Sequence, residues 1–228
     1  MAAIFDPRKL TAEALGAFTL IFVGPGSVML AAGNSNVTLV GVALAHGLAI
    51  GLMASALGAI SGAHFNPAVT IAMWVTRRIE TLPAVGYIIA QCLGGMLGGV
   101  ALLVFFPEGL QTAANFGTPT LGAGIDFAKG VGIEAILTFF LVIVIFGTAV
   151  DSRAPKLGGI AIGLTITMDI LCGGRLTGAA MNPVRALGPA VVAGSWDNHL
   201  VYWIGPIMGA VGAALLYHYL FIEEPAKA

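Results

Sequence analysis

The sequence predicts an all-α membrane protein with six transmembrane helices, two re-entrant half-helices and an inverted internal repeat. Three observations lead to this fold class. The 228 residues are 58% hydrophobic and only 9% charged, whereas about a quarter of the residues in a soluble domain are charged. Long apolar segments recur along the whole chain. Two similar stretches, each centred on Asn-Pro, interrupt the apolar sequence at corresponding places in its two halves.

Six apolar segments approach or exceed the length of a membrane-spanning helix, which is about 20 residues. The predicted spans are Thr11–Ala31, Val37–Ile60, Leu82–Phe106, Phe127–Val150, Leu157–Cys172 and His199–Phe221. Arg8 and Lys9 precede the first span, as basic residues do in a signal peptide. The length of that span and the Glu13 inside it favour a helix that is retained.

Each Asn-Pro stretch predicts an irregular run that leads into a short helix. The first stretch covers residues 61–70 and the second covers residues 177–186. Asn is a favoured N-cap residue because its side-chain oxygen accepts from a free backbone N–H, and Pro suits the first helical position. The resulting half-helices, Pro67–Val75 and Pro183–Val192, are too short to span the membrane. A pair of short broken segments at matching places indicates a pore or a binding site.

The two halves of the chain match beyond these stretches. The matched pairs are Glu13 with Glu134, Ala49–Leu52 with Ala161–Leu164, Asn66 with Asn182, and Tyr87 with Tyr202. We therefore expect one domain over residues 1–228, with repeat one at about 10–106, repeat two at about 127–221, and an outer loop at about 107–126. An odd number of spans in each half inverts the second repeat, so the half-helices enter from opposite faces and their N-termini meet near the bilayer centre.

The basic residues predict the orientation, because they accumulate on the cytoplasmic side of a membrane. If both termini share one side, that side carries most of the basic residues: Arg8, Lys9, Arg77, Arg78, Arg153, Lys156 and Lys227. The other side carries Lys129, Arg175 and Arg185. We therefore expect cytoplasmic termini, a first Asn-Pro loop that enters from the cytoplasm, and a second that enters from outside.

The opposed half-helices also predict the kind of solute that the centre accepts. Helix N-termini carry partial positive charge and therefore disfavour cations. Backbone carbonyls of the irregular runs have no helical partner, and irregular backbone at this depth must be buried or line a watery cavity. The expected acceptors are the carbonyls of Gly62, Ala63, His64, Gly178 and Ala180, with donors from the amides of Asn66 and Asn182. A narrow hydrated path lined by these acceptors and donors suits a small neutral polar molecule.

These features resemble those of the aquaporins, the major intrinsic protein family. The resemblance covers nearly the whole chain, and its most specific residues are Asn66-Pro67-Ala68 and Asn182-Pro183-Val184 followed by Arg185. It implies an aquaporin-like fold and a passive water channel that excludes protons, with no catalytic residue, metal or cofactor. Val184 departs from the family pattern, which usually has Ala there, and it adds bulk behind the cap.

Arg185 lies three residues after Asn182, so both residues face one side of a helix. An arginine at membrane depth is costly and by default functional. The resemblance makes Arg185 the arginine of the outer selectivity filter and, by spacing from the motifs, assigns His46, Ile170 and Ala179 to the other filter positions. This set resembles the filter of plant vacuolar aquaporins. Strict water channels usually have Phe in place of His46 and His in place of Ile170.

Two intramembrane carboxylates, Glu13 and Glu134, allow two interpretations. An ionisable residue inside a span can belong to a proton relay. The resemblance instead implies a structural role, in which each carboxylate accepts backbone N–H bonds from the irregular loop of its own half. Asp169 and Arg175 are expected to flank the outer mouth, where they could pair.

The solutes beyond water leave alternatives open. Ammonia is expected to pass because Ile170 offers no hydrogen bond, while urea, hydrogen peroxide or glycerol would indicate a wider channel. Glycerol-conducting relatives usually carry Asp directly after the filter arginine, where this chain has Ala186. An ion-coupled secondary transporter shares inverted repeats and broken helices, but it needs an acidic site for its coupling ion. No enzyme motif such as HExxH or GxSxG occurs.

The expected partners are water, small neutral solutes and membrane lipid, and a net charge of −1 indicates no nucleic acid. The resemblance implies a homotetramer in the cell membrane. Gly94-Gly95 and Gly98-Gly99 of the third span fit close helix packing, either within or between subunits.

Overall fold

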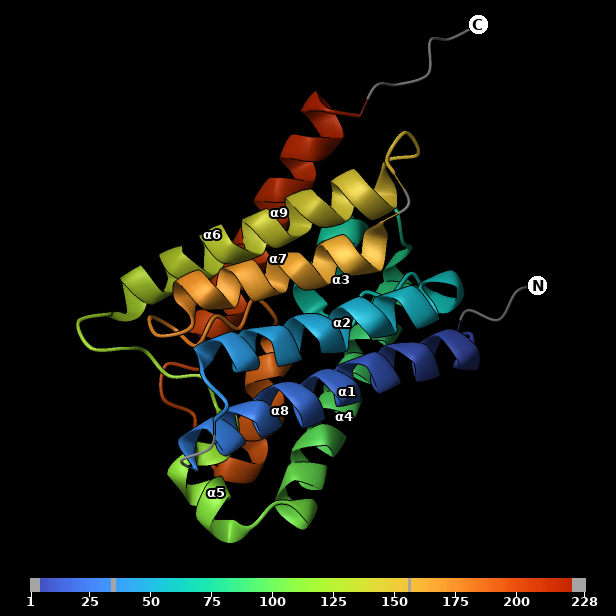
Figure 1. Ribbon diagram of the computed structural model, residues 1–228. Coiled ribbons are helices and arrows are strands. Elements are labelled where there is room, and N and C mark those ends of the chain that lie inside the picture. Colours follow the sequence, from blue (N-terminus) through green and yellow to red (C-terminus); the bar gives the residue numbers. More distant parts are fainter. Residues whose placement is uncertain (1–4, 34–35, 156, 223–228) are drawn as a thin grey trace, which may run out of the picture.

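The computed structural model describes residues 5–33, 36–155 and 157–222, and all regular structure in these ranges is helical (Figure 1). Lys156 and Lys227, which contribute to the predicted orientation, and both ends of the predicted domain 1–228 lie outside the described residues. Within the described ranges, five helices are long and apolar enough to span a membrane: α1 (Pro7–Ala32), α2 (Leu39–Ser61), α4 (Thr81–Phe105), α6 (Phe127–Ile145) with its π-helical extension Phe146–Val150, and α9 (Val201–Leu220).

The sixth predicted span and the two half-helices are shorter. Helix α7 (Gly158–Gly173) has 16 residues, which cover about 24 Å at a rise of about 1.5 Å per residue. The half-helices are α3 (Pro67–Val75) and α8 (Pro183–Ala193). The predicted segments thus differ from the observed helices by a few residues at their ends, and the predicted fold class is confirmed. The outer loop additionally contains helix α5 (Glu108–Ala113) and the 3-10 turn Asn115–Gly117.

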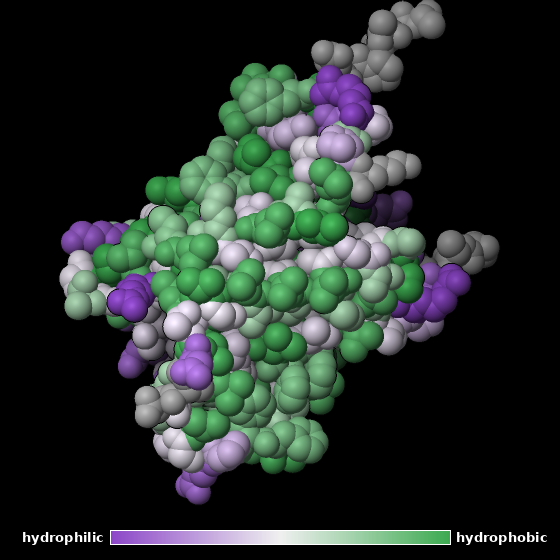
Figure 2. Space-filling view, in the orientation of Figure 1, coloured by the Kyte–Doolittle hydropathy of each residue, from purple (hydrophilic) through white to green (hydrophobic). Residues whose placement is uncertain are grey.

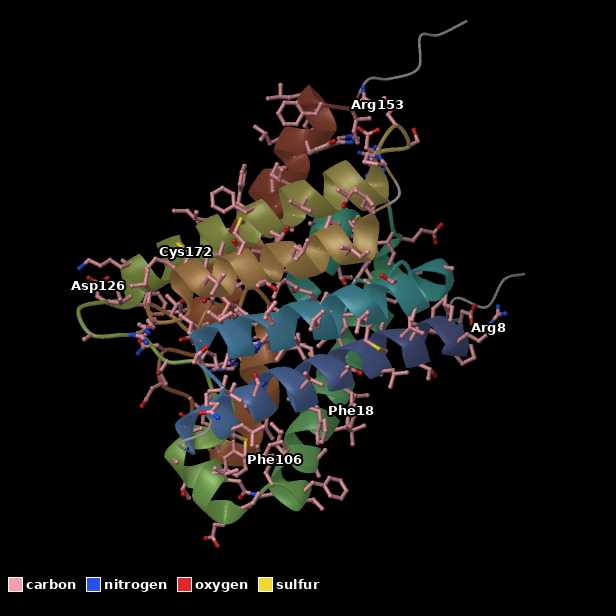
Figure 3. All side chains as sticks on the ribbon, in the orientation of Figure 1. Arg8, Phe18, Phe106, Asp126, Arg153 and Cys172 are labelled. Atoms are coloured by element: carbon pink, nitrogen blue, oxygen red, sulfur yellow. The ribbon has the colours of Figure 1, made fainter. Side chains whose placement is uncertain are left out.

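The helices pair in equivalent ways in the two halves. Helix α1 packs along α4 and α6 packs along α9, while α2 and α7 join the halves. Each half-helix packs mainly against the last span of the opposite half, α3 against α9 and α8 against α4. Arg8 and Arg153 lie at one end of the bundle, and Asp126 and Cys172 lie at the other (Figure 3).

Glycines allow the close approach of these helices. A Cβ atom on Gly94 would lie 2.1 Å from the carbonyl oxygen of Ala14 in α1, and one on Gly98 would lie 3.0 Å from that of Phe18. The other two glycines of this run face α8, where a Cβ on Gly99 would lie 2.3 Å from the oxygen of Gly188. Of the two kinds of packing expected for these glycines, the one within the chain is therefore the one observed.

Large apolar side chains cover the outer faces of the long helices, and hydrophilic residues gather at the two ends of the bundle (Figure 2). Leu44, Leu48 and Leu52 of α2 are all exposed, with Leu52 at 64%. A helix that turns leucines outward at every fourth residue is suited to hydrocarbon and not to water. The chain is therefore an integral, multi-pass membrane protein.

Candidate pore and selectivity filter

The two Asn-Pro loops adopt the same unusual backbone conformation. In the first loop φ is +86° at Gly62, +52° at Ala63 and +51° at Phe65. The second loop repeats this pattern at Gly178, Ala179 and Met181, with φ values of +86°, +45° and +52°. Non-glycine residues rarely adopt positive φ, and they persist there only when the surroundings fix them.

Glu13 fixes the first loop. Its Oε1 accepts a hydrogen bond from Ser61 Oγ at 2.6 Å and one from the His64 N–H at 3.0 Å. Its Oε2 accepts from the Phe65 N–H at 2.7 Å and from Gln91 Nε2 at 2.7 Å. These four donors surround a carboxylate that is fully buried. Their arrangement corresponds to the structural interpretation of Glu13.

Glu134 holds the second loop in the same way. It accepts from Thr177 Oγ1 at 2.6 Å, from the Ala180 N–H at 2.9 Å and from the Met181 N–H at 2.7 Å. A tyrosine hydroxyl also donates to each loop, from Tyr87 to the Ser61 carbonyl and from Tyr202 to the Thr177 carbonyl. Sequence reasoning missed the hydroxyl groups of Ser61 and Thr177 as donors to the two glutamates, although these residues occupy equivalent positions in their loops.

The two cap asparagines link the halves at the centre. Asn66 Oδ1 accepts from the Ala68 N–H at 2.9 Å, and Asn182 Oδ1 accepts from the Val184 N–H at 3.0 Å, so each caps its half-helix. Each amide nitrogen then donates to the opposite loop, from Asn66 to the Met181 carbonyl at 2.8 Å and from Asn182 to the Phe65 carbonyl at 2.9 Å. Because an amide has two N–H donors, each asparagine keeps one for a solute.

A continuous cavity of about 290 Å³ passes both asparagines. The loops contribute Gly62, Ala63, His64, Ala180 and Met181 to the lining, and apolar side chains come from α1, α2, α3, α6 and α7. The cavity extends from Arg78 to Arg185. Gly178, which was expected to line this pore, instead lines a second cavity of about 300 Å³ on the side that the sequence predicts to be outer.

Three of the four predicted filter residues, His46, Ile170 and Arg185, line both cavities and therefore separate them. Ala179 lines the inner cavity beside them. All four side chains are at most 4% exposed. The ring is thus the boundary between the pore and an outer vestibule.

The hydrogen bonds of this ring determine what it offers to a solute. His46 Nδ1 lies 2.8 Å from the Val42 carbonyl oxygen. Because a carbonyl only accepts, Nδ1 carries the proton, and in the neutral imidazole Nε2 is an acceptor. His46 Nε2 has no protein partner. Arg185 donates from Nη1 to the Gly117 carbonyl at 2.8 Å, while its Nε has no protein partner.

Val184 is accommodated by a glycine on a neighbouring helix. The side chain is fully buried, and a Cβ on Gly95 of α4 would lie 2.2 Å from Val184 Cγ1. The extra bulk relative to the family's Ala therefore fills space that Gly95 leaves empty. The N-cap bond from the Val184 N–H to Asn182 is retained.

Asp169 and Arg175, which could pair if both flank the outer mouth, form no ion pair with each other. Asp169 is 1% exposed and does not line either cavity, whereas Arg175 is exposed and lines the outer vestibule. None of the ion pairs among the described residues involves either side chain. Both residues were expected near the mouth, but Asp169 lies on the buried face of α7.

The inner end of the pore contains a residue that sequence reasoning did not assign to it. Arg78 lines the cavity, and its guanidinium carbon lies 5.4 Å from the centroid of the Phe146 ring. Nearby, Asp151 accepts from Arg153 and from the Tyr217 hydroxyl. The hydrogen bonds from Arg153 hold the pKa of the Asp151 carboxyl well below its usual range, so this carboxylate remains ionised at neutral pH.

Comparisons with known proteins identify the family. The sequence pattern of the family described as "Major intrinsic protein" matches residues 3–217. The chain is 41% identical to Aquaporin-4 of Mus musculus over 222 residues, 95% of this chain and 68% of the relative. It is also 41% identical to Aquaporin TIP4-4 of Zea mays over 227 residues, 95% of this chain and 88% of the relative. Aquaporin NIP1-1 of Oryza sativa is 40% identical over 223 residues.

A solved structure shows the same fold. The aquaglyceroporin from Plasmodium falciparum superposes with a TM-score of 0.84 at 24% identity, over 93% of this chain and 96% of that one. Together with the sequence matches, the geometry indicates a passive channel for water or small solutes. The chain belongs to the major intrinsic protein family, whose members are channels and not enzymes.

Proposed function

We propose that the chain conducts water through the cavity between Arg78 and Arg185 and excludes protons. The observation that carries this proposal is the cavity itself, which brings both cap asparagines and all four filter residues into one lining. A water molecule at the centre accepts from the remaining N–H of Asn66 and Asn182. Above and below, the loop carbonyls accept from it.

Proton exclusion follows from the opposed half-helices. The N-termini of α3 and α8 both face the centre, where their dipoles place positive potential. A hydronium ion meets this potential and then the guanidinium of Arg185. Water molecules on both sides of the centre donate away from it. The chain of water molecules therefore lacks the single donor direction that proton transfer along it needs. Helix dipoles and an arginine are established means of excluding protons from such pores.

We further propose that ammonia passes the filter. Ile170 gives the ring an apolar wall, which lowers the relative cost for a solute that forms weaker hydrogen bonds than water. Urea and hydrogen peroxide are further candidates, because the small Ala179 leaves space in the ring. Ala186 in place of the Asp of glycerol-conducting relatives argues against glycerol.

An ion-coupled transporter is disfavoured by the state of the buried acids. Glu13 accepts four hydrogen bonds and Glu134 accepts three, all from donors of their own halves. Neither carboxylate lines the cavity. A coupling ion would have to displace the bonds that fix both loops.

Stopped-flow measurements on proteoliposomes test these proposals, with osmotic, ammonia-gradient, proton and glycerol arms. We expect water and ammonia flux above that of empty vesicles, and proton and glycerol flux at the background level. In the double variant His46→Phe plus Ile170→His, ammonia flux should fall while water flux persists. Background ammonia flux in the parent, or undiminished ammonia flux in the double variant, would exclude ammonia as a solute. A parent that conducts no water would exclude the main proposal.

The proposed assembly is a homotetramer in the cell membrane, with both termini cytoplasmic and one pore per subunit. Support comes from the family and, for the orientation, from Arg8 and Arg153, which share one end of the bundle (Figure 3). The glycines of α4 do not add support for the tetramer, since they pack against other helices of the same chain.

A further inference from the structure

The outer vestibule contains a second arginine that water conduction does not use. Arg175 lies between α7 and α8 and lines the cavity of about 300 Å³ outside the filter, together with Arg185. No Asp or Glu lines this cavity. Within the described ranges, every ion pair is formed by other residues. Two arginine residues therefore belong to the lining of the same outer space, and neither forms an ion pair with the residues described.

The vestibule also contains hydrogen-bond donors without protein partners. Arg185 is only 4% exposed and leaves its Nε–H unpaired. Thr118 Oγ1 is buried in the same lining and likewise has no partner. Guanidinium groups present planar sets of donors that match carboxylate and phosphate oxygens. Positive charge in a narrow cleft with apolar walls also concentrates anions.

An anion that enters this vestibule meets a barrier below it. The filter ring includes the His46 imidazole, whose Nδ1–H is bonded to the Val42 carbonyl, and the apolar side chain of Ile170, so neither donates to an anion. Below the ring, Ala179, Ala180 and Met181 line the pore, and backbone carbonyls in this loop repel negative charge. Arg175 lines only the outer cavity, so an anion held by both arginines lies above the ring.

We propose that the outer vestibule binds a small divalent oxyanion of the dicarboxylate class between Arg175 and Arg185, and that the bound anion closes the pore to water. The closing step rests on the proposed water conduction, whereas the binding step does not. Two separate measurements therefore keep the two proposals distinguishable.

The first measurement is binding of isotope-labelled malonate to the full chain in phosphatidylcholine nanodiscs at constant ionic strength. We expect saturable binding at one site per chain, weakened at least tenfold in Arg175→Gln and largely kept in Arg175→Lys. Lys129→Gln is the matched control, because Lys129 is also a basic residue near the outer end but is absent from the vestibule lining. Absence of saturable binding, or equal binding by the parent and Arg175→Gln, would overturn the inference.

The second measurement is osmotic water flux in phosphatidylcholine vesicles, with malonate or chloride on both sides at equal ionic strength. Malonate should lower the flux at least twofold in the parent and in Lys129→Gln. Arg175→Gln, compared with its own value in chloride, should show no such reduction. Malonate that binds without lowering a measurable water flux would refute the closing step. Absence of water flux in chloride would instead contradict the proposed function, and the binding result would still stand.

A lipid headgroup carries similar oxygens, so vesicles that contain phosphatidylglycerol form a third arm. We expect the flux in chloride to be independent of this lipid. An Arg175-dependent loss of flux caused by phosphatidylglycerol, without any effect of malonate, would assign Arg175 to the membrane surface and overturn the proposal.

Discussion

At the scale of single residues, Arg185 combines deep burial with incomplete hydrogen bonding. One nitrogen is tied to the Gly117 carbonyl, while Nε has no protein partner and the residue is 4% exposed. The bond to Gly117 fixes the position of the guanidinium, and the Nε–H is buried without a protein acceptor. Burial of a charge without an ion-pair partner is expensive, which indicates that the residue is kept for its role in the ring.

Arg185→Ala should loosen the filter, because it removes both bulk and a fixed positive charge from the ring that separates the two cavities. We expect the ratio of urea to water permeability to rise several-fold and proton leakage to increase. Stopped-flow light scattering and a pH-sensitive dye measure the two effects, with Arg175→Ala as a control outside the ring. Unchanged selectivity in Arg185→Ala would show that the filter is elsewhere.

Gly95 and Val184 form a second residue-scale test. Gly95→Ala places a Cβ 2.2 Å from Val184 Cγ1, and such overpacking costs about 1–3 kcal/mol. Val184→Ala in the same chain should restore much of that stability, since it removes the clashing methyl groups. A double-mutant cycle on thermal unfolding in detergent measures the coupling, which we expect at about 0.5–3 kcal/mol. Strictly additive effects would contradict the packing described here.

At the scale of elements, the loop conformation depends on glycine at the first left-handed position. In Gly178→Ala, the alanine would have to adopt the φ of +86° found at Gly178, and its Cβ would lie 2.7 Å from Pro119 Cβ. Both effects oppose folding of the second loop, so the variant should unfold at a lower temperature and conduct less water per chain. Gly58→Ala is the control, since nothing lies within 4 Å of its added Cβ. Equal behaviour of the two variants would contradict this account.

The elements were also the part of the structure that local sequence patterns predicted best. Apolar length predicted the spans, and Asn-Pro predicted both half-helices, because capping and helix initiation involve adjacent residues. The burial of Asp169 was not predicted, since it depends on how α7 is rotated against its neighbours. The contact of Val184 with Gly95 and the crossed asparagine bonds were also missed, because they form only when distant segments dock.

At the scale of the whole molecule, the apolar surface of α2 and α7 can face either lipid or other subunits. The outer face of α2 and α7 forms a shallow apolar groove around Leu48, Leu52, Ile160 and Leu164. The proposed tetramer predicts that native mass spectrometry in mild detergent detects four chains, and that this species is lost as the detergent becomes harsher. Monomers alone under the mildest conditions would count against it.

The crossed bonds of the cap asparagines have a consequence for how the protein is made. Asn66 and the carbonyl it binds are 115 residues apart, and Asn182 and its partner are 117 residues apart. At a synthesis rate of about 5–20 residues per second, the ribosome needs on the order of ten seconds to add that length. During this interval the first loop already exists, but its amide and carbonyl have no protein partners. The first loop can therefore complete its crossed hydrogen bonds only after the second loop has been synthesised.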